Sequence, residues 1–416
     1  MNPLKILLSI VFLLSFASIT NALSIDEKLD LVIKVHQLEL KQCSPNQTSN
    51  IFEIKAGKAL FESKLLSGEK NISCSDCHLK KFGSGDGLPM AVGTGAKGSG
   101  YDRLNHGGAL VQRNALSLEG RANPEFKSLF WDGKIQVENG QIIAPYGKER
   151  SARFSNALAA ASVLPIMERD ELLGAKDFFS TNDIQRAVED SVHHERFDLV
   201  SNAIRDRLNK SNSNADSSLK NALVNANINL KDIDLSTIGN LLSVFIQSEF
   251  PCELSRWDQY ISGNKEALTN NEKNGAVIFY GKGRCASCHQ GTFLSDFSFH
   301  SIGTPQGKFG PHSRTRDIGR AAVTSNGSDL FKFRTPPLNN VSKTSPYGHN
   351  GVFKTLTEVV IHHYDPVSFY LRNPAIYEGD SFRTGKLINS RDTLLSGINL
   401  RSSQELDDLI SFLKTL

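Results

Sequence analysis

The sequence lacks an excess of either charge, a second long apolar run and the alternating pattern of half-buried strands. Its 47 Lys and Arg residues nearly balance 44 Asp and Glu residues, which leaves a formal net charge of +3. This balance gives no argument for a nucleic-acid or polyanion partner. Beyond the N-terminus, no segment is apolar enough to cross a bilayer. Little period-two patterning predicts a mainly α-helical chain, and 416 residues allow two or three domains.

The one long apolar run lies at the N-terminus. Lys5 precedes the run from Ile6 to Ile19, and Thr20-Asn21-Ala22 then offers small residues at positions that suit signal-peptidase cleavage. The run is short for a membrane span. We therefore interpret residues 1–22 as a signal peptide, whose removal leaves no membrane span.

Cysteine is also scarce, and four of the six cysteines belong to one repeated pattern. The copies are Cys74-Ser75-Asp76-Cys77-His78 and Cys285-Ala286-Ser287-Cys288-His289. In each copy the two thiols can add to the vinyl groups of a haem while the histidine binds the iron. A helical segment with the same glycine and phenylalanine precedes each copy, Gly57 to Phe61 and Gly275 to Phe279. The repeat predicts two covalently bound haem c groups, which bacteria attach outside the cytoplasm, so we expect a periplasmic protein.

The two remaining cysteines are Cys43 and Cys252. In an oxidising compartment a leftover pair can form a disulfide. Sequence alone does not show that their backbones approach closely enough, so two buried thiols stay an equal alternative.

Apolar residues recur near helical spacing over most of the chain. We expect helices over residues 24–40, 53–66, 156–164, 182–208, 219–250, 272–280, 355–364 and 403–416. Pro165 is expected to end the third of these helices, and the polar stretch 209–218 has the composition of a loop. Residues 83–108 are glycine-rich and irregular, which predicts a long ordered loop of the kind that is usually functional.

Many segments, in a fixed order, resemble the bacterial dihaem cytochrome c peroxidase family, which includes the MauG-type enzymes that oxidise tryptophans in a partner protein. The segments are CSDCH, QRN, FWDGK, LPIMERDELLG, SRWDQY, CASCHQG, FHSIG, DIGR, FRTPPLNNV and TSPYGHNGVFKTLTEVV. The resemblance implies a mainly α fold of two cytochrome c-like haem domains with long ordered loops. Residues 23–245 would form the peroxidatic domain and residues 246–416 the electron-transfer domain.

The resemblance assigns the haem residues by position. It implies that the N-terminal haem is peroxidatic and that the C-terminal haem receives electrons and passes them across. His78 and His289 are then the proximal ligands of the two irons. The thioether positions are Cys74, Cys77, Cys285 and Cys288.

A carboxylate matches the distal glutamate of the family. That residue follows a proline by six positions, and Pro165 and Glu171 have this spacing. A positioned carboxylate can take a proton from the iron-bound oxygen of peroxide and return it to the departing oxygen. Glu168 is a weaker candidate, because it lies only three residues after the proline. Outside this motif, Glu171 would be interpreted as a solvated acid at a helix end.

Two further residues match positions close to the peroxidatic iron. Trp131 matches the tryptophan that the family places between the two haems, and in an apolar FWDG segment it can also be a core residue. His106 matches a histidine that occupies the distal side of this iron in many resting peroxidases. MauG-type members lack that ligand, so a surface histidine stays the alternative.

A metal ion is also implied by the resemblance. Asn114, Thr344 and Pro346 match the family's calcium site at the domain junction. A side-chain oxygen and main-chain carbonyls suit this hard cation, with waters completing the shell. Arg113-Asn114 could equally form a turn.

Methionine is nearly absent, and here the chain departs from the family. Typical peroxidases use methionine as the sixth ligand of the C-terminal iron, and MauG-type enzymes use tyrosine. After residue 22 the chain holds only Met90 and Met167, both far ahead of the second haem motif. In the family the sixth ligand follows the proline that matches Pro346 by seventeen residues, and this spacing leads to His363. Neighbouring helical residues point about 100° apart, so we predict His363 as the ligand, with Tyr364 second and His362 third.

The leading functional hypothesis is a periplasmic dihaem peroxidase that reduces hydrogen peroxide to water with electrons from a small redox protein such as a cytochrome c. The alternatives are a MauG-like oxidase acting on a protein or peptide and a dihaem electron carrier. His300 and His349 lie in matching motifs around the second haem, where we expect them to bond propionates or backbone.

Overall fold

The computed structural model describes residues 23–43, 50–174, 182–188, 191, 193–211, 213–306, 316–374 and 381–416. The predicted signal peptide lies outside these ranges. Within them the chain is mainly α-helical, as predicted. None of the described helices has the length and apolar character needed to cross a membrane.

Helices dominate, and five short strands form two small sheets. The helices are α2 (Ile25–Val35), α3 (Ile51–Glu62), α4 (Lys148–Ser151), α5 (Ala157–Met167), α6 (Asp183–Ala187), α7 (His193–Lys210), α8 (Asn214–Asn225), α9 (Leu235–Glu249), α10 (Arg256–Ile261), α11 (Asn270–Tyr280), α12 (Ala321–Thr324), α13 (Leu356–Tyr364), α14 (Pro366–Arg372), α15 (Ser381–Asn389) and α16 (Ser403–Leu413). One antiparallel sheet has the order β1 (Ser128–Leu129), β2 (Ile135–Glu138), β3 (Gln141–Ile143), and the other pairs β4 (Phe299–His300) with β5 (Phe333–Arg334).

Two helix predictions were wrong in detail. Helix α5 continues through Pro165 to Met167, because a proline in the last turn removes a single backbone hydrogen bond and does not have to end the helix. The polar stretch predicted as a loop contains the end of α7 and the start of α8. Ser213 caps α8 by accepting a hydrogen bond from the Asp216 amide, so the serines and asparagines there mark helix ends.

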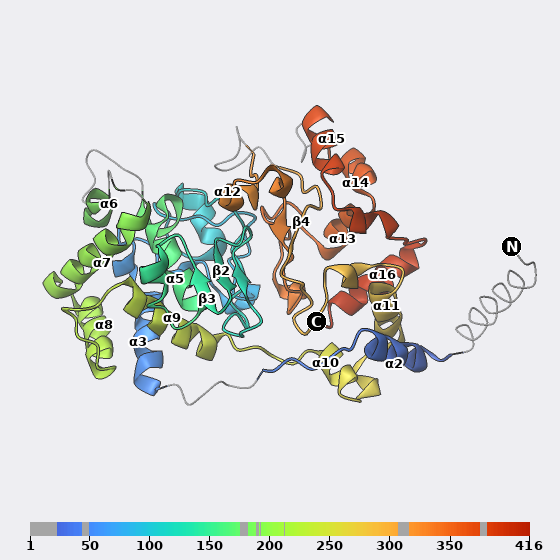
Figure 1. Ribbon diagram of the computed structural model, residues 1–416, viewed down its shortest axis with the longest axis horizontal. Coiled ribbons are helices and arrows are strands. Elements are labelled where there is room, and N and C mark those ends of the chain that lie inside the picture. The colour runs from blue at the N-terminus through green and yellow to red at the C-terminus, as the bar shows by residue number, and fades with distance from the viewer. Residues whose placement is uncertain are drawn as a thin grey trace, which may run out of the picture.

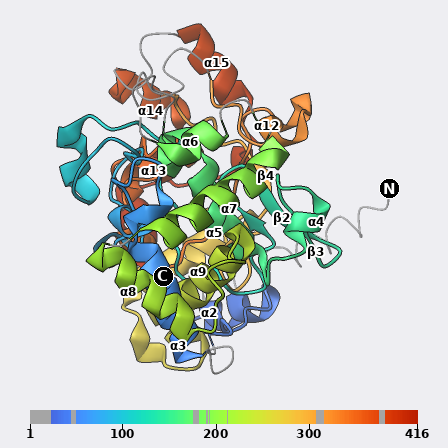
Figure 2. The same cartoon turned by 90° about the vertical axis from the view of Figure 1, so that its left-hand side faces the viewer.

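The helices gather into two lobes, each with its own apolar core (Figure 1). The first lobe, residues 50–250, is built around α3, α5 and α9 and faces the viewer in Figure 2. The second lobe comprises α2 and residues 255–416, with α11 packed on α16. The glycine repeated ahead of each haem motif has the same role in both lobes. A Cβ at Gly57 would clash with the Leu241 carbonyl of α9, and one at Gly275 with the Asp408 carbonyl of α16.

The chain crosses between the lobes twice, once between α2 and α3 and once after α9. Helix α2 packs on α11, with Leu29 fully buried in the second core. The chain then returns to the first lobe, and Cys43 forms a disulfide with Cys252 on the segment that follows α9. The two Cα atoms lie 5.2 Å apart, within the range that a disulfide spans. The pairing left open by the sequence is therefore present.

The domain boundary predicted at residue 246 falls inside α9, which runs to Glu249 and packs in the first core through Phe250. Helix α2, predicted in the first domain, packs on the second core. The sequence could not show either feature, because both depend on which apolar faces meet. We propose a division after Phe250, with α2 joined to the C-terminal domain.

Candidate functional site

The first haem motif opens with a short helical turn, Cys74–Asp76, set against the first core. Both cysteines are free thiols in an apolar environment. Burial raises the pKa of Cys74 to about 12 and that of Cys77 further. The two sulfurs therefore stay protonated and are not joined to each other, which leaves both available for thioether bonds.

The ring of His78 is prepared to bind a metal. Its Nδ1 donates to the Ser84 carbonyl at 2.7 Å, and burial lowers its pKa, so the ring is neutral. With Nδ1 protonated, the lone pair lies on Nε2, as is usual for a histidine ligand fixed by a backbone acceptor. The Ser84 hydroxyl in turn meets the Ser117 hydroxyl at 3.1 Å and accepts from the Leu118 amide at 2.7 Å.

Glu171 lies in the π-helical turn Arg169–Leu173 that follows α5. Its main-chain carbonyl accepts from the Thr94 amide at 3.0 Å, which ties this turn to the long loop. The Glu171 charge contributes to the raised pKa of both Cys74 and Cys77, so the carboxyl is close to the first motif. Burial, and then the charge of Glu168, raise the pKa of Glu171 to about 7.

The weaker candidate, Glu168, has a different environment. Its carboxylate pairs with Lys134 at 3.4 Å. Within the described part of the chain, the Glu171 carboxylate makes no hydrogen bond or ion pair. Of the two acids, Glu171 is therefore the one free to exchange a proton with a small molecule near the first motif.

The loop over residues 83–108 is ordered, as predicted, and Arg103 holds it together. This side chain is fully buried and donates to the carbonyls of Val92 and Gly98 at 2.6 and 3.0 Å. His106 ends the short helical segment Gly100–His106, where it is exposed and its Nδ1 bonds to the Asp102 carbonyl at 2.9 Å. No contact between His106 and the first motif is found among the described residues.

The second motif repeats the arrangement of the first. His289 Nδ1 donates to the Leu294 carbonyl at 3.1 Å, which leaves Nε2 with the lone pair. Burial and then the nearby His363 lower the pKa of His289 to about 4, so this ring is also neutral. Burial raises the pKa of Cys285 to about 12.

A cavity of ≈ 230 Å³ adjoins the second motif and brings together residues predicted separately. Cys285, Cys288 and His289 line it, together with His363 and Tyr364 from α13. His363 Nδ1 donates to the Val359 carbonyl at 2.7 Å, so its Nε2 is free, and burial lowers its pKa.

The neighbouring His362 is engaged elsewhere. Its Nε2 donates to the Ile302 carbonyl at 2.9 Å, and its buried ring packs between Phe353 and Phe369. Burial lowers its pKa to about 3. Of the two histidines, His363 has the arrangement of a metal ligand.

Trp131 lines the same cavity from the first lobe and is buried. Its Nε1 donates to the Asn114 carbonyl at 3.1 Å, and its own carbonyl accepts from the Arg334 amide at 2.8 Å. The indole is therefore a buried group of the first lobe that lies at the cavity of the second motif.

The three predicted calcium ligands also meet at this cavity. Asn114 uses Nδ2 to donate to the Leu88 carbonyl at 2.7 Å, which directs its Oδ1 elsewhere. In the described structure the carbonyls of Thr344 and Pro346 accept no hydrogen bond. All three residues line the cavity, and each carries an oxygen of the kind that a hard cation takes as a ligand.

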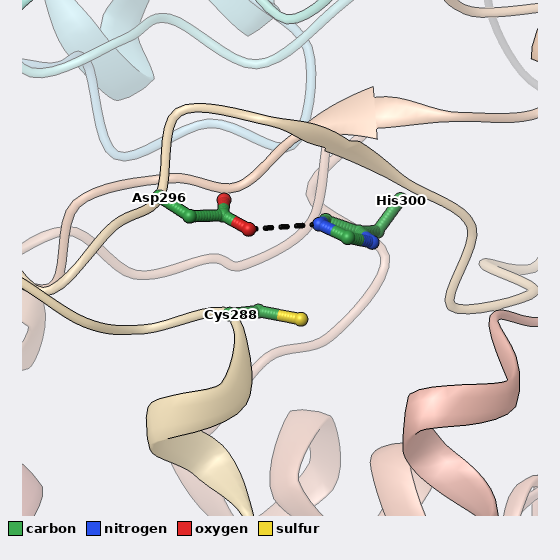
Figure 3. Close-up of side chains that lie close together, drawn as sticks. All are labelled: Cys288, Asp296 and His300. Carbon is green, nitrogen blue, oxygen red and sulfur yellow. Dashed lines mark hydrogen bonds and ion pairs between the residues drawn. The ribbon is translucent and has the colours of Figure 1, made fainter.

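His300 differs from the expectation that it bonds propionates or backbone. Its ring bonds to two carboxylates, Asp296 at 2.9 Å and Asp392 at 2.6 Å. The hydrogen bond to Asp296 is the largest cause that raises the pKa of His300, to about 11, followed by the Cys288 sulfur and Asp392. Figure 3 shows Cys288, Asp296 and His300 together. Their possible ligand atoms lie within 4.8 Å of one another. Because Cys288 belongs to the haem motif, we do not interpret this trio as a separate metal site.

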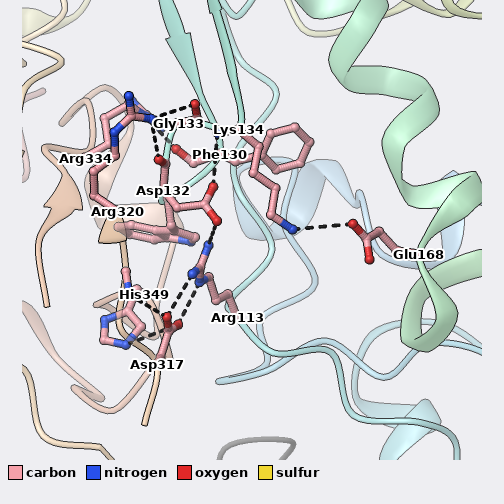
Figure 4. A network of polar contacts seen from close by, with 12 residues as sticks. Arg113, Phe130, Asp132, Gly133, Lys134, Glu168, Asp317, Arg320, Arg334 and His349 are labelled. Carbon is pink, nitrogen blue, oxygen red and sulfur yellow. Dashed lines mark hydrogen bonds and ion pairs between the residues drawn. The ribbon is translucent and has the colours of Figure 1, made fainter. Parts of the chain in front are cut away.

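A buried ionic network joins the lobes (Figure 4). Arg113 pairs with Asp132 of the first lobe at 2.6 Å and forks onto both oxygens of Asp317 of the second lobe at 2.7 and 2.8 Å. His349, stacked on Phe333 with ring centroids 3.6 Å apart, lies 3.9 Å from Asp317. Its carbonyl accepts from the Asn114 amide. The network therefore holds Asn114 in place. Asn114 is a candidate calcium ligand, and its carbonyl accepts the hydrogen bond from Trp131.

Replacing Arg113 with alanine should lower the free energy of unfolding by about 3–5 kcal/mol, because two buried carboxylates lose their partner. Burial alone would raise the pKa of Asp317, but Arg113 outweighs it and holds that pKa well below the usual range. This stabilisation is present above pH ~4 and is lost as the pH falls further. Denaturant titration of wild type and variant at pH 7 and pH 3 measures both effects. Arg153→Ala, which removes an exposed ion pair with Asp234, is the control and should cost at most about 1 kcal/mol.

Comparison with known proteins places the chain in a family. A family model for di-haem cytochrome c peroxidase matches residues 53–266, more than half of the chain. The chain therefore belongs to the di-haem cytochrome c peroxidase family. Similar proteins include the cytochrome-c peroxidase IdrP1 of Pseudomonas sp. (strain SCT), 28% identical over 393 residues that cover 88% of this chain and 80% of the relative. The methylamine utilization protein MauG of Methylophilus methylotrophus is 22% identical over 313 residues, 74% of this chain and 70% of the relative.

Solved structures share the fold. The diheme peroxidase BthA from Burkholderia thailandensis superposes with a TM-score of 0.58 at 20% identity, over 91% of this chain and 90% of the other. A MauG-like protein associated with microbial copper homeostasis gives a TM-score of 0.54 at 23% identity, over 91% and 94% of the two chains.

Family membership implies two haem c groups, and the residues present fit them. Each motif supplies two thiols that form no disulfide and a histidine whose Nδ1 is held by a backbone carbonyl. The cavity at the second haem motif is also lined by two buried arginines, Arg121 and Arg334. Each has a terminal nitrogen without a hydrogen-bond partner. Such orphaned cations suit the carboxylates of a haem. Sequence reasoning assigned no role to either arginine, because no spacing rule links residue 121 to residue 334.

Proposed function

We propose that this protein is a periplasmic dihaem peroxidase that reduces hydrogen peroxide to water with two electrons from a small redox protein. The observation that supports this most directly is Glu171, a partly buried carboxyl whose pKa is raised to about 7 and which lies beside the first haem motif. A group that must accept and then release a proton at neutral pH works best with such a pKa. A pure electron carrier needs neither this carboxyl nor the long loop packed on it.

In this proposal Cys74, Cys77 and His78 Nε2 would hold the first haem, which would supply the iron that activates peroxide. Glu171 accepts the proton from the peroxide oxygen that will bind and returns it to the oxygen that leaves as water. Two electrons and two protons complete the conversion of one peroxide to two waters. Arg103 and the loop around it position the Glu171 turn through the Thr94 amide.

The remaining predicted residues would serve electron delivery. His289 and His363 would hold the second iron, and Trp131, which lines the same cavity, would relay electrons between the two haems. Asn114, with the carbonyls of Thr344 and Pro346, would bind one calcium ion beside that path. His106 would not occupy the first iron in the conformation described, since it is exposed on the loop surface.

A MauG-like oxidase of a protein or peptide substrate is the second candidate. Two observations favour it: the sequence holds no methionine after the second motif, and His363 and Tyr364 line the cavity. Nitrogen or phenolate ligation lowers the reduction potential relative to a thioether, which suits storage of oxidising equivalents better than acceptance of electrons from a high-potential donor.

Steady-state peroxide consumption by the haem-loaded protein, with reduced cytochrome c as donor, separates the two candidates. The assay is run with and without prior half-reduction. Donor oxidation coupled two to one with peroxide supports the peroxidase. No turnover with any small donor, together with an oxidised species that persists in peroxide, would replace it with the oxidase.

A further inference from the structure

Two arginines from different lobes line the cavity of the second haem motif without a carboxylate partner. Arg121 belongs to the first lobe and is 7% exposed, and Arg334 on β5 is fully buried. Neither forms an ion pair within the described ranges. Glu119, the nearest acid to influence Arg121, is hydrogen-bonded to Asn340.

In each guanidinium the Nε atom donates a hydrogen bond, whereas one terminal nitrogen has no hydrogen-bond partner. Arg334 Nε donates to the Phe130 carbonyl at 2.9 Å, and Arg121 Nε donates to the Ser117 carbonyl at 2.7 Å. Arg121 also lies over the Phe126 ring, 4.8 Å from its centroid. Yet Arg334 Nη2 and Arg121 Nη1 are buried without a hydrogen-bond partner. The rigid attachment through Nε means that the free ends cannot turn to water without breaking these bonds.

The two cations also repel each other. Burial lowers the pKa of Arg334 to about 10, and burial followed by the charge of Arg334 lowers that of Arg121. A pair of like charges in an apolar site is unfavourable unless an anion lies between or beside them. Arginine suits a carboxylate in particular, because its planar fork can form two parallel hydrogen bonds.

We propose that Arg121 and Arg334 together bind the carboxylates of the haem attached to Cys285 and Cys288 and hold its reduction potential up. The cavity that contains the free nitrogens also contains both thioether cysteines and His289, so the macrocycle and the cations share one space. Two guanidinium charges next to the porphyrin stabilise the reduced state, which carries one more negative charge. This role does not depend on peroxide chemistry and holds for either candidate function.

Arg121→Gln and Arg334→Gln in the haem-loaded protein test the proposal by spectroelectrochemical titration. Each variant should lower the midpoint potential of the second haem, and the double variant should lower it further, while the first haem shifts less. Arg320→Gln is the control, because Arg320 is a cation of the same interface that bonds the Asp132 and Gly133 carbonyls and does not line this cavity. A second-haem potential unchanged in both single variants would overturn the proposal.

If a glutamine variant does not load haem, lysine variants and a measurement on the wild-type protein still test the proposal. Arg121→Lys and Arg334→Lys keep the charge and should load haem with potentials closer to wild type. In the wild-type protein itself, the resonance Raman propionate bands of the second haem should be those of ionised, hydrogen-bonded carboxylates and should not change between pH 8 and pH 5. Protonation of these carboxylates within that range would refute the assignment, whatever the variants do.

Discussion

Replacing Glu171 with glutamine should lower the peroxide turnover of the haem-loaded protein by about 10²- to 10⁴-fold. The substitution keeps the size of the side chain but removes the group that can carry a proton from one peroxide oxygen to the other. Because the carboxylate makes no hydrogen bond in the described structure, its loss should not reduce thermal stability. Stopped-flow measurement of peroxide consumption, with thermal unfolding as a check on folding, gives the result.

The pH profile adds a second test of the same residue. Burial raises the pKa of Glu171 to about 7, and the group must be ionised to accept the first proton. The kcat/KM for peroxide should therefore rise with pH up to about 7 and level off above it, and Glu171→Gln should lack this rise. Glu168→Gln is the matched comparison: it should keep the rise, because Glu171 is intact, but with the inflection at a lower pH, because the Glu168 charge contributes to the raised pKa of Glu171. A profile that keeps the same inflection in Glu171→Gln would assign the proton to another group.

Replacing His363 with alanine should convert the second haem from a six-coordinate low-spin centre to a centre without its native sixth ligand. The free Nε2 of His363 and its proximity to His289 in the cavity are the reasons. The effect should appear as loss of the low-spin signals of that haem in optical and electron paramagnetic resonance spectra, and electron entry through it should change with it.

Tyr364→Phe provides the comparison, because Tyr364 follows His363 in α13 and lines the same cavity. It should leave the low-spin spectrum intact. A spectrum altered by Tyr364→Phe and unaltered by His363→Ala would make the phenolate the ligand. His362 is not expected to substitute, since its Nε2 is held by the Ile302 carbonyl within an aromatic packing site.

The chemistry of the chain could be predicted from local pattern wherever the reacting groups are close in sequence. The two CxxCH motifs predicted two haem groups, ten ordered segments that include these motifs identified the family, and family membership is confirmed. The mainly helical fold and the ordered loop were predicted for the same reason, since periodicity and glycine content are local properties. The roles of Glu171, His363 and the calcium residues stay predictions.

Features that depend on distant residues escaped prediction. The π-helical turn that presents Glu171 is set by packing on Gly93, where a Cβ would clash with the Asp170 carbonyl. The groups that fix His78 and His289 are backbone carbonyls. Any residue type carries such a carbonyl, so the sequence could not identify them. The three short strands around Trp131 were also missed, because strands of two to four residues are too short to show alternation.

The disulfide between Cys43 and Cys252 limits how far the two lobes can swing. It joins the two segments that cross between them, and Lys41, just before Cys43, forms a buried ion pair with Asp258 of the second lobe at 2.8 Å. A single flexible linker would act as a hinge, whereas two crossings bonded to each other resist rotation. Electron tunnelling weakens steeply as a gap widens, so a restrained hinge would keep the proposed path through Trp131 at a nearly constant length. Slow domain motion would then not limit the proposed transfer between the haems.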